Sequence, residues 1–427
     1  MQPRAFLASL EQFGVKLGLE QIRRLLAALD HPERACPAIT VAGTNGKGSV
    51  TAMLERGLRA AGFRTGRYTS PHLIHLEERF ALDGRPVLPA ALDAALARVA
   101  AAAAPFEHLP TYFEATTAAA LLLFAGHRAD VSVLEVGLGG RLDATNAVDA
   151  VAVVVTAIDL DHQQLLGPTI DAIAREKAAV IKPGSLVVAA DNRPDVLDVI
   201  RGRCRQVGAE LVMATADVSA QVDMADGRVR LQLSTPVRHY ADLTLALRGR
   251  HQAANAIAAI RMLELLDAHG IFPVPEAAIR TAVEDVVWPG RLEPLTIGGT
   301  PVLLDGAHNE AGAAALAAYV REAIGRPVPL VFGVLRDKDV DAVADRLASI
   351  ASCVVCTAPD SPRAVAPDDL AAVVSRVASP GVAVDVDPSP AAAIARAAGH
   401  GTPVVVAGSL FLAGEVRALA GRDVAQP

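Results

Sequence analysis

The chain has 427 residues, of which 52% are hydrophobic and 20% are charged, and its formal net charge is −7. One hydrophobic core stops growing at roughly 250–300 residues, so this length predicts two domains, and the composition is typical of a compact protein. The negative charge speaks against nucleic acid as a partner, and the lack of a long apolar run predicts no membrane partner and a cytoplasmic location.

Short apolar, β-branched runs alternate with helical patterns through the first half of the chain. Because strands that are buried on both faces are continuously apolar, this alternation predicts a mostly parallel sheet covered by helices on both sides. The expected strands are 38–43, 64–71, 131–137, 151–159 and 185–190, and the expected helices are 49–61, 90–103, 114–125, 169–181 and 195–207.

The pattern changes after residue 207. Polar and apolar residues alternate from about 211 to 247, which predicts a small antiparallel extension at the side of the first domain. A helix is expected at 251–269, and the α/β pattern resumes after Trp288-Pro289-Gly290. We therefore expect two α/β domains, 1–293 and 294–427, with the boundary near Pro294 and a Rossmann-like second domain.

Four cysteines, Cys36, Cys204, Cys353 and Cys356, are too few and too scattered for a disulfide framework. Cys353 and Cys356 have the CxxC spacing of metal and redox sites. They lie in an apolar run that reads as a buried strand, and there is no second CxxC to complete four metal ligands. We therefore interpret them as residues of the core.

The segment from Gly43 to Ser49, GTNGKGS, has the composition of a phosphate-binding loop with altered spacing. Two residues instead of the usual four separate the first glycine, Gly43, from the Gly-Lys pair that begins at Gly46. In addition, Gly48 separates Lys47 from Ser49. Glycines let backbone N–H groups close on phosphate oxygens at a helix N-terminus. The preceding strand and following helix favour such a site over a purely structural glycine turn and predict a P-loop ATPase-like first domain.

Polar side chains follow several expected strands, at the sheet edge where open α/β sheets bind ligands. Ser70, Glu135 and His162 are such residues, and together with phosphate oxygens they form a plausible ligand set for Mg²⁺. Glu135 is the strongest single case because a carboxylate after a buried run needs a cation or a pair. His162 taken alone is equally consistent with a hydrogen-bonded loop histidine.

The sequence pattern alone does not decide the roles of several other polar residues. Arg141, Asp143 and Asn146, in RLDATN, are consistent either with ligand binding or with capping of a loop. Lys177 has by default the pattern of a solvated helical lysine.

Several ordered segments together resemble the Mur ligase superfamily, and specifically its folate branch, the dihydrofolate synthase/folylpolyglutamate synthase family. The resemblance extends from about residue 17 to residue 415. The segments are AGTNGKGS, YTSPHL, TYFEATT, EVGLGGRLDATN, REKAAVIKPG, HQAANA, PGRLE, LLDGAHN and AGSLFLAGE.

The resemblance implies an ATP-dependent amide ligase that acts through an acyl phosphate. The carboxylate of dihydropteroate or of a tetrahydrofolate (poly)glutamate would attack the γ-phosphate, and the amine of L-glutamate would then displace phosphate. Such chemistry depends on positioning and cations rather than on a protein nucleophile. ATP and two Mg²⁺ ions are the implied cofactors, and a monomer is the implied state.

The resemblance also implies roles for particular residues. Gly46, Lys47, Gly48 and Ser49 match the ATP phosphate loop, and Ser70, Glu135 and His162 match magnesium ligands. Lys177 matches a lysine that is carbamylated to hold the second Mg²⁺. Asn255, Arg291 and Asp305 match nucleotide contacts, and His308 is expected to face the reacting centre from the second domain. The implied acceptor-binding residues are Gly18, Leu19, Glu20, Thr111, Tyr112, Phe113, Glu114, Leu142, Asp143 and Ala144.

The sequence leaves the acceptor open. It departs from the family pattern at 78–80, at 163–165 and at Glu310, all in loops on the substrate side. The alternatives are a folylpolyglutamate synthase without the first activity, a ligase for peptidoglycan precursors, and a nucleotide-dependent switch. The segments TYFEATT and YTSPHL speak against the peptidoglycan alternative, and a switch would hydrolyse ATP without an amine acceptor.

Overall fold

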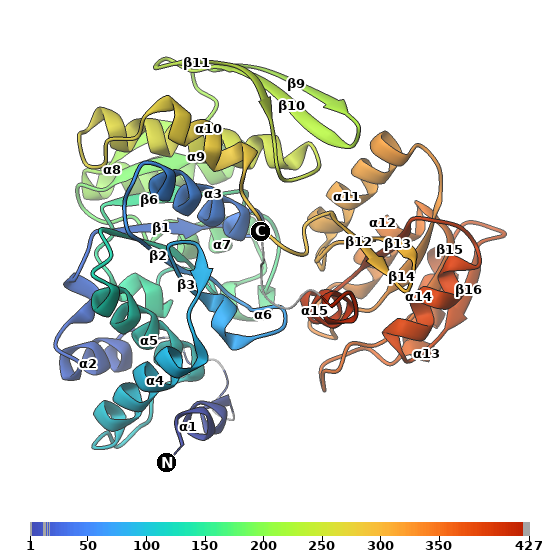
Figure 1. Ribbon diagram of the computed structural model, residues 1–427, viewed down its shortest axis with the longest axis horizontal. Helices are drawn as coiled ribbons and strands as arrows, with labels where there is room; N and C mark the ends of the chain where they lie inside the picture. Colours follow the sequence, from blue (N-terminus) through green and yellow to red (C-terminus); the bar gives the residue numbers. More distant parts are fainter. Residues whose placement is uncertain (1, 12–13, 15, 17, 422–427) are drawn as a thin grey trace.

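The computed structural model describes residues 2–11, 14, 16 and 18–421. Two α/β units stand side by side, and the chain passes from one to the other once, near residue 290 (Figure 1). This arrangement confirms the predicted fold class. Within the described residues, no helix is long and apolar enough to cross a membrane.

The first unit is built on an eight-stranded sheet in the order β4-β3-β2-β5-β1-β6-β7-β8. Six strands, from β2 to β8 in this order, are parallel, whereas β3 and β4 form an antiparallel edge that the sequence analysis did not predict. The bounds are β1 (Ala38–Ala42), β2 (Thr65–Tyr68), β3 (Phe80–Leu82), β4 (Arg85–Pro86), β5 (Val131–Glu135), β6 (Ala152–Val155), β7 (Leu186–Ala189) and β8 (Glu210–Met213).

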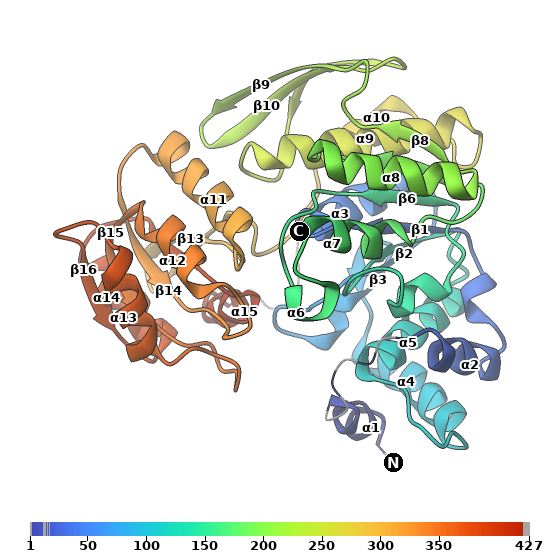
Figure 2. The ribbon, with the colours of Figure 1, turned by 180° about the vertical axis from the view of Figure 1, so that it is seen from behind.

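Helices cover both faces of this sheet, as Figure 2 shows from behind. The helices α3 (Lys47–Ala60), α9 (His251–Ala268) and α10 (Glu276–Glu284) share one apolar core with the strands. A second core on the opposite face holds α1 (Pro3–Ser9), α2 (Glu20–Ala28), α4 (Pro89–Ala103) and α5 (Tyr112–His127). The helices α7 (Ile170–Ala178) and α8 (Pro194–Val207) pack over β6 and β7. The loops that follow the parallel strands therefore meet at the carboxyl edge of the sheet, between the helix layers.

The predicted antiparallel strands are present as β9 (Ser219–Ala225), β10 (Arg228–Ser234) and β11 (His239–Thr244). They form a sheet of their own rather than a lateral extension bonded to the first sheet. Alternate residues of β10, Val229, Leu231 and Leu233, are buried and join the core of α9. Burial of this one apolar face against the helix layer stabilises the three strands without hydrogen bonds to the edge of the main sheet.

The second unit holds a six-stranded sheet in the order β12-β13-β17-β14-β15-β16. The strands are β12 (Glu293–Ile297), β13 (Thr300–Leu304), β14 (Val328–Phe332), β15 (Ala351–Cys356), β16 (Ala383–Val386) and β17 (Val404–Ala407). Its helices are α11 (Glu310–Tyr319), followed by the π-helical η5 (Val320–Ile324), α12 (Val340–Ala348), α13 (Pro367–Val377), α14 (Pro390–Ala398) and α15 (Leu410–Leu419). Cys353 and Cys356 are buried in β15, which confirms their structural interpretation.

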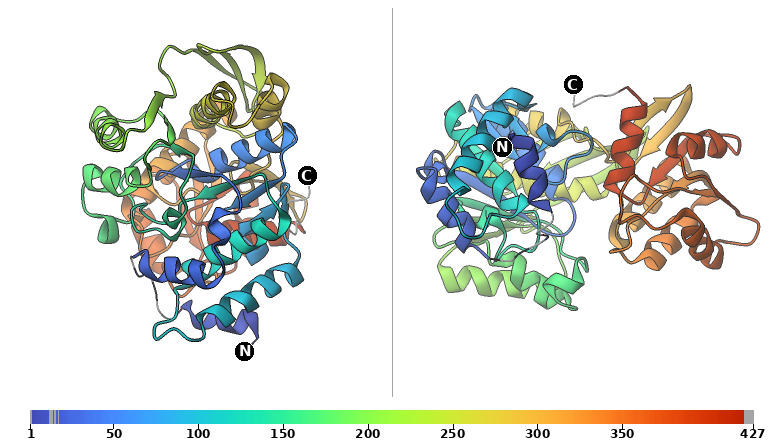
Figure 3. Two further views of the ribbon diagram at one scale, coloured as in Figure 1. Left: turned by 90° about the vertical axis from the view of Figure 1, so that its left-hand side faces the viewer. Right: turned by 90° about the horizontal axis from the view of Figure 1, so that it is seen from below.

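The two units touch through several segments. In Figure 3, α15 lies on the side of the second unit that faces the first, and Leu73 of the first unit packs against the core that contains α15. Tyr319 donates a hydrogen bond to the carbonyl of Gly227 in the β9–β10 turn. The expected boundary near Pro294 falls in β12, where Glu293 already pairs with Leu304, so residues 285–292 are the connecting segment.

Candidate active site

The phosphate-loop candidate joins the end of β1 to the start of α3. Gly46 precedes α3 with φ +87°, and a Cβ there would overlap the Asn255 side chain. Both the left-handed backbone and the close contact therefore require glycine. Gly48 and Ser49 are buried in the first turn of α3, where unpaired backbone N–H groups form an anion site.

Two lysines converge on this loop. Lys47 Nζ donates to the carbonyls of Gly43 (3.1 Å) and Thr44 (2.9 Å), and Lys177 Nζ reaches the same Gly43 carbonyl at 2.6 Å from α7. Lys177 is only 5% exposed, so the default expectation of a solvated lysine is wrong. Burial, and then the charge of Lys47, lower the pKa of Lys177 to about 7. An amine with this pKa is neutral in a large part of the molecules at pH 7.

Glu135 ends β5 and is buried beside β1, because its strand pairs with β1 in parallel register. Its Oε2 accepts a hydrogen bond from the backbone N–H of Ser70 (3.1 Å). Burial raises the pKa of Glu135, whereas the charges of Lys47 and Arg291 oppose this effect. A buried carboxylate and a serine next to it fit a hard cation such as Mg²⁺, because oxygen ligands and a need for positive charge are both present.

His162 follows β6 in a left-handed conformation, with its Nε2 3.8 Å from Asp161 Oδ2. Burial lowers the pKa of His162, so the neutral imidazole that can bind a metal is favoured. The structure thus places Ser70, Glu135, His162 and Lys177 around one phosphate loop. Among the described residues, no group of three or more His, Cys, Asp or Glu could hold a metal. A Mg²⁺ site here would therefore depend on Ser70 and a modified Lys177 as well.

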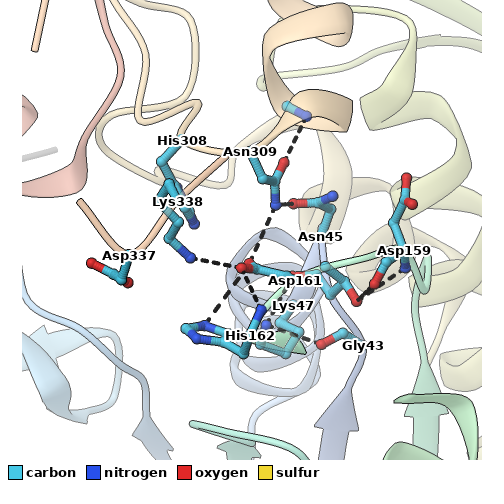
Figure 4. A network of polar contacts seen from close by, with 12 residues as sticks. Gly43, Asn45, Lys47, Asp159, Asp161, His162, His308, Asn309, Asp337 and Lys338 are labelled. Carbon is cyan, nitrogen blue, oxygen red and sulfur yellow. Dashed lines mark hydrogen bonds and ion pairs between the residues drawn. The ribbon is translucent and has the colours of Figure 1, made fainter. Parts of the chain in front are cut away.

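Polar contacts that Figure 4 shows tie the second unit to Asn45 of the phosphate loop and to Asp161, which follows β6. Lys338 Nζ forms an ion pair with Asp161 Oδ1 at 2.7 Å, and Asn309 Nδ2 donates to Asn45 Oδ1 at 3.0 Å. Asn309 Nδ2 also lies 3.5 Å from Asp161 Oδ2. We call Asn45, Asp161, Asn309 and Lys338 the interdomain latch.

Electrostatics support the latch. Burial alone would raise the pKa of Asp161, but Lys338 and His162 beside it hold this pKa well below its usual value. The side chains of Asp161 and Lys338 are only 12% and 8% exposed. Sequence reasoning did not select Lys338, because nothing in its own segment indicates a partner 177 positions away. Asn309 could be recognised from the sequence as an N-cap residue, and its side chain accepts a hydrogen bond from Gly312 N at the start of α11.

Three predicted residues, Arg291, Asp305 and His308, lie near this junction. Asp305 is buried, and its carboxylate accepts from Leu292 N and Ala307 N, both at 2.8 Å. Burial raises the pKa of Asp305 while Arg291 opposes the rise. Asp305 therefore shapes the loop that carries Arg291, whose Nη1 donates to Gly290 O.

His308 is a neutral base by geometry and by charge. Its Nδ1 lies 2.8 Å from the carbonyl of Gly306, which only accepts, so Nδ1 carries the proton and Nε2 keeps its lone pair. Burial, followed by the charge of Lys338, lowers the pKa of His308 to about 4. At neutral pH the imidazole is therefore uncharged and keeps a free lone pair at Nε2, but its low pKa makes it a weak base that takes a proton only from a more acidic group.

The expected acceptor-binding segments meet where α2, α5 and the short helix η4 (Ala144–Ala147) pack together. Gly18 and Leu19 are half-buried just before α2, and Glu20 begins that helix at the surface. Leu142 is half-buried and Ala144 is buried beside them. These segments lie on the face of the sheet opposite α3.

The two buried acids of these segments, Glu114 and Asp143, are engaged in local hydrogen bonds. Glu114 Oε2 accepts from the N–H and the hydroxyl of Thr111, both at 2.8 Å, which makes a capping box at the start of α5. Asp143 accepts from Leu138 N and Thr145 N, so the capping alternative applies to it. Phe113 packs where a Cβ on Gly137 would lie, and Tyr112 lies beneath the Arg79 guanidinium. Because these acids are already hydrogen-bonded, the rings of Tyr112 and Phe113 are the side chains of these segments that suit contact with a flat ligand.

A glycine loop with converging lysines, a buried carboxylate and a second α/β unit latched over them define a ligase of the Mur type. The sequence matches the Mur ligase middle domain over residues 41–263 and the Mur ligase glutamate ligase domain over residues 290–410. It is 37% identical to the dihydrofolate synthase/folylpolyglutamate synthase of Bacillus subtilis, over 84% of this chain and 85% of that protein. The chain therefore belongs to the dihydrofolate synthase/folylpolyglutamate synthase family of Mur ligases.

Further relatives agree. The enzyme of the same name from Mycobacterium tuberculosis is 36% identical, over 95% of this chain and 90% of that protein. A solved structure of M. tuberculosis folylpolyglutamate synthase, complexed with ADP and AMPPCP, superposes with a TM-score of 0.90 at 33% identity, covering 99% of this chain and 100% of the other. Escherichia coli FolC, in complex with DHPP and ADP, gives 0.86 at 31% identity, covering 98% and 97%.

Proposed function

We propose that this protein is an ATP-dependent ligase that adds L-glutamate to dihydropteroate and to tetrahydrofolate (poly)glutamates. The observation that carries the proposal is the convergence of Lys47 and Lys177 on one loop carbonyl, beside Glu135 and beneath the second unit. This arrangement suits a polyphosphate and its metals. The names of the relatives with both activities support the two acceptors. A protein with only the second activity is the alternative.

In the first step, an oxygen of the acceptor carboxylate forms a bond to the γ-phosphorus of ATP. The bond from that phosphorus to the β–γ bridging oxygen breaks, and ADP leaves with the electron pair. Lys47, the N–H groups of Gly48 and Ser49, and Arg291 would stabilise the charge on the phosphates. Asn255, which is buried against Gly46, would contact the nucleotide.

The residues around the loop would hold two Mg²⁺ ions. Ser70, Glu135 and His162 would bind the first, and Lys177 would bind the second after its neutral amine has added CO₂ and lost a proton. The resulting carbamate supplies oxygen ligands, which an ammonium cannot. When bound, such ions neutralise phosphate charge and orient the transferred group.

In the second step, the amine of L-glutamate forms the C–N bond at the acyl carbon, and phosphate leaves with the electrons of the C–O bond. His308 Nε2 would accept the proton that the amine loses. The interdomain latch would keep the second unit closed over the acyl phosphate and so exclude water. Closure matters because hydrolysis would waste the intermediate.

The protein acts, in this proposal, as a cytoplasmic monomer with an ATP-binding domain and a glutamate ligase domain that are joined by the connecting segment 285–292. Phosphate release tests the function, with ATP, Mg²⁺ and L-glutamate present and with dihydropteroate and tetrahydrofolate offered separately. We expect release that requires both an acceptor and glutamate. Release without glutamate would favour a nucleotide switch, and no release with either acceptor would refute the ligase.

A further inference from the structure

The loop that follows β2 is a compact segment whose two ends lie together. The strands β2 and β3 pair with each other directly before and after it, and Thr69 N donates to Arg79 O at 3.0 Å. Residues 69–79 therefore leave the sheet and return to it at one place, as compact surface loops do. We call this segment the β2–β3 loop. Ser70, near its start, donates its backbone N–H to Glu135, so the loop begins at the proposed site.

One carboxylate holds the middle of this loop. Glu78 Oε2 accepts the backbone N–H of Leu73 (2.8 Å), and Glu78 Oε1 accepts those of Ile74 (3.0 Å) and His75 (2.8 Å). Hydrogen bonds from N–H groups to a carboxylate are charge-assisted and stronger than neutral ones. Because they fix the backbone of three consecutive residues, the conformation of the loop depends on a single side chain.

The part of the loop that Glu78 holds also receives the second unit. Gly414 is buried in α15, and a Cβ there would lie 2.0 Å from the carbonyl oxygen of Leu73. Gly414 does not have a positive φ, so the close contact, and not the backbone conformation, requires glycine at this position. The Leu73 side chain packs against the core that contains α15. The helix α15 can therefore dock only while Leu73 keeps its position.

The residue after Glu78 fixes the loop from the acceptor side. Arg79 is buried, its Nε donates to His72 Nδ1 at 2.9 Å, and its guanidinium lies 5.4 Å from the Tyr112 ring. Burial, and then the charge of Arg79, lower the pKa of His72 to about 4, so a neutral imidazole accepts this hydrogen bond. The loop is thus in contact with the proposed site, the acceptor-binding segments and the second unit.

We propose that Glu78 is a positioning residue of the ligase, whose carboxylate holds the β2–β3 loop in the conformation that places Ser70 beside Glu135 and receives α15 at Leu73. The proposal rests on the ligase function proposed above and adds to it a link between docking of the second unit and the geometry of the site. When α15 is docked, Leu73 is held between this helix and the Glu78 carboxylate. The loop then cannot move Ser70 without breaking one of these contacts, so the docked state is the one that reacts.

The test is the substitution Glu78→Gln, with kcat and KM measured for phosphate release from ATP in the presence of Mg²⁺, dihydropteroate and L-glutamate. Glutamine has the same size, but its amide NH₂ group would face backbone N–H groups that also donate, so at least one hydrogen bond is lost. We expect kcat to fall about tenfold to a hundredfold, as is usual for a lost coupling between two parts of a protein. The KM for ATP should change less than about threefold, because the phosphate loop is untouched. Glu78→Asp keeps the charge and should recover part of kcat.

Gly414→Ala perturbs the same contact from the second unit. Alanine is a better helix former than glycine, so α15 itself should stay folded, whereas the new methyl group would overlap Leu73 O. We expect the same loss of kcat as for Glu78→Gln. Small-angle scattering should show a larger radius of gyration for both variants, because the second unit docks less completely.

Matched controls exist for both substitutions. Glu77 precedes Glu78 but pairs with Arg4 of α1 at 2.6 Å, and Arg4 is partly exposed, so Glu77→Gln should keep kcat within about twofold of wild type. Gly202 lies inside α8, where a Cβ would meet no described atom within 4 Å. Gly202→Ala should therefore have the kcat and the radius of gyration of the wild type.

A double variant separates this role from a general loss of stability. If Glu78 and Gly414 both act through Leu73, Glu78→Gln combined with Gly414→Ala should lose no more kcat than the more impaired single variant. Additive losses, or either single variant with the kcat of the wild type, would overturn the proposal. If Glu78→Gln does not fold, Gly414→Ala decides the matter, because its loop keeps the native carboxylate. A wild-type protein without glutamate-dependent turnover would refute the ligase function instead, and scattering would still report the docking.

Discussion

The interdomain latch makes a quantitative prediction for Lys338→Met. The substitution removes the ammonium that lies 2.7 Å from Asp161 and leaves this carboxylate, 12% exposed, without its cation. Breaking a buried pair costs about 3–5 kcal/mol. Water can enter the gap when the units separate, so we expect the lower end, about 3 kcal/mol, which lowers the closed population by roughly a hundredfold where open and closed forms are balanced.

The assay separates closure from nucleotide binding. We expect kcat for phosphate release with glutamate to fall by about two orders of magnitude. The KM for ATP should change less, since the phosphate loop and Asn255 belong to the first unit. Small-angle scattering should show a larger radius of gyration for the variant. Lys338→Arg should recover part of the activity because it restores the charge.

A double-mutant cycle tests the pair itself. If the two side chains act together, Lys338→Met combined with Asp161→Asn should cost much less than the sum of the single changes. Additive effects on kcat, or a Lys338→Met variant within twofold of wild type, would refute the latch.

Three further predictions concern single residues. Lys177→Ala should lower activity at least a hundredfold at limiting Mg²⁺, and removal of CO₂ from the buffer should reversibly lower wild-type activity; undiminished activity of the variant would contradict the carbamate. Gly46→Ala should weaken ADP binding measured by calorimetry by tenfold or more, because a Cβ would overlap Asn255 at φ +87°; unchanged affinity would mean that the loop adapts. His308 has a pKa of about 4 in the folded protein and about 6.5 when unfolded, so the stability that depends on its neutral form is present above pH 6.5 and is lost as the pH falls toward 4. Urea unfolding at pH 7 and pH 5 should show a smaller pH-dependent loss for His308→Gln than for wild type, and equal losses would contradict this assignment.

Most of the fold could be predicted because buried parallel strands leave a strong signal. The apolar run 151–159 became β6, with all four strand residues buried, and the alternation around Val229 and Leu231 became β10. The β3–β4 edge has no comparable signal, since its strands contain only three and two residues. The position of the antiparallel sheet depended on which surface its apolar face would cover, and the pattern of the strands does not contain that information.

The site was predictable only in part. The glycine loop and Glu135 could be recognised from the sequence because clustered glycines and a carboxylate are unusual at the ends of apolar strands. The burial of Lys177 depends on tertiary contact, because the loop at Gly140 packs so closely on α7 that a Cβ there would lie 2.5 Å from Glu176 O. Lys338 acts through a partner on another element, so its own segment gives no indication of a role.

The two lysines at Gly43 explain why the site suits a reaction that creates and transfers phosphate. Two ammonium groups that share one carbonyl repel each other, and this repulsion is part of the reason why the pKa of Lys177 is lowered to about 7. Bound phosphates would relieve it by adding negative charge. Carbamylation would relieve it differently, because it turns the second cation into an anion beside Lys47. A single residue would thereby remove the repulsion and supply the oxygen ligands for a metal. This gives a physical reason for a lysine, rather than a carboxylate, at position 177. A lysine can be a cation, a neutral amine or an anionic carbamate, whereas a carboxylate cannot be a cation.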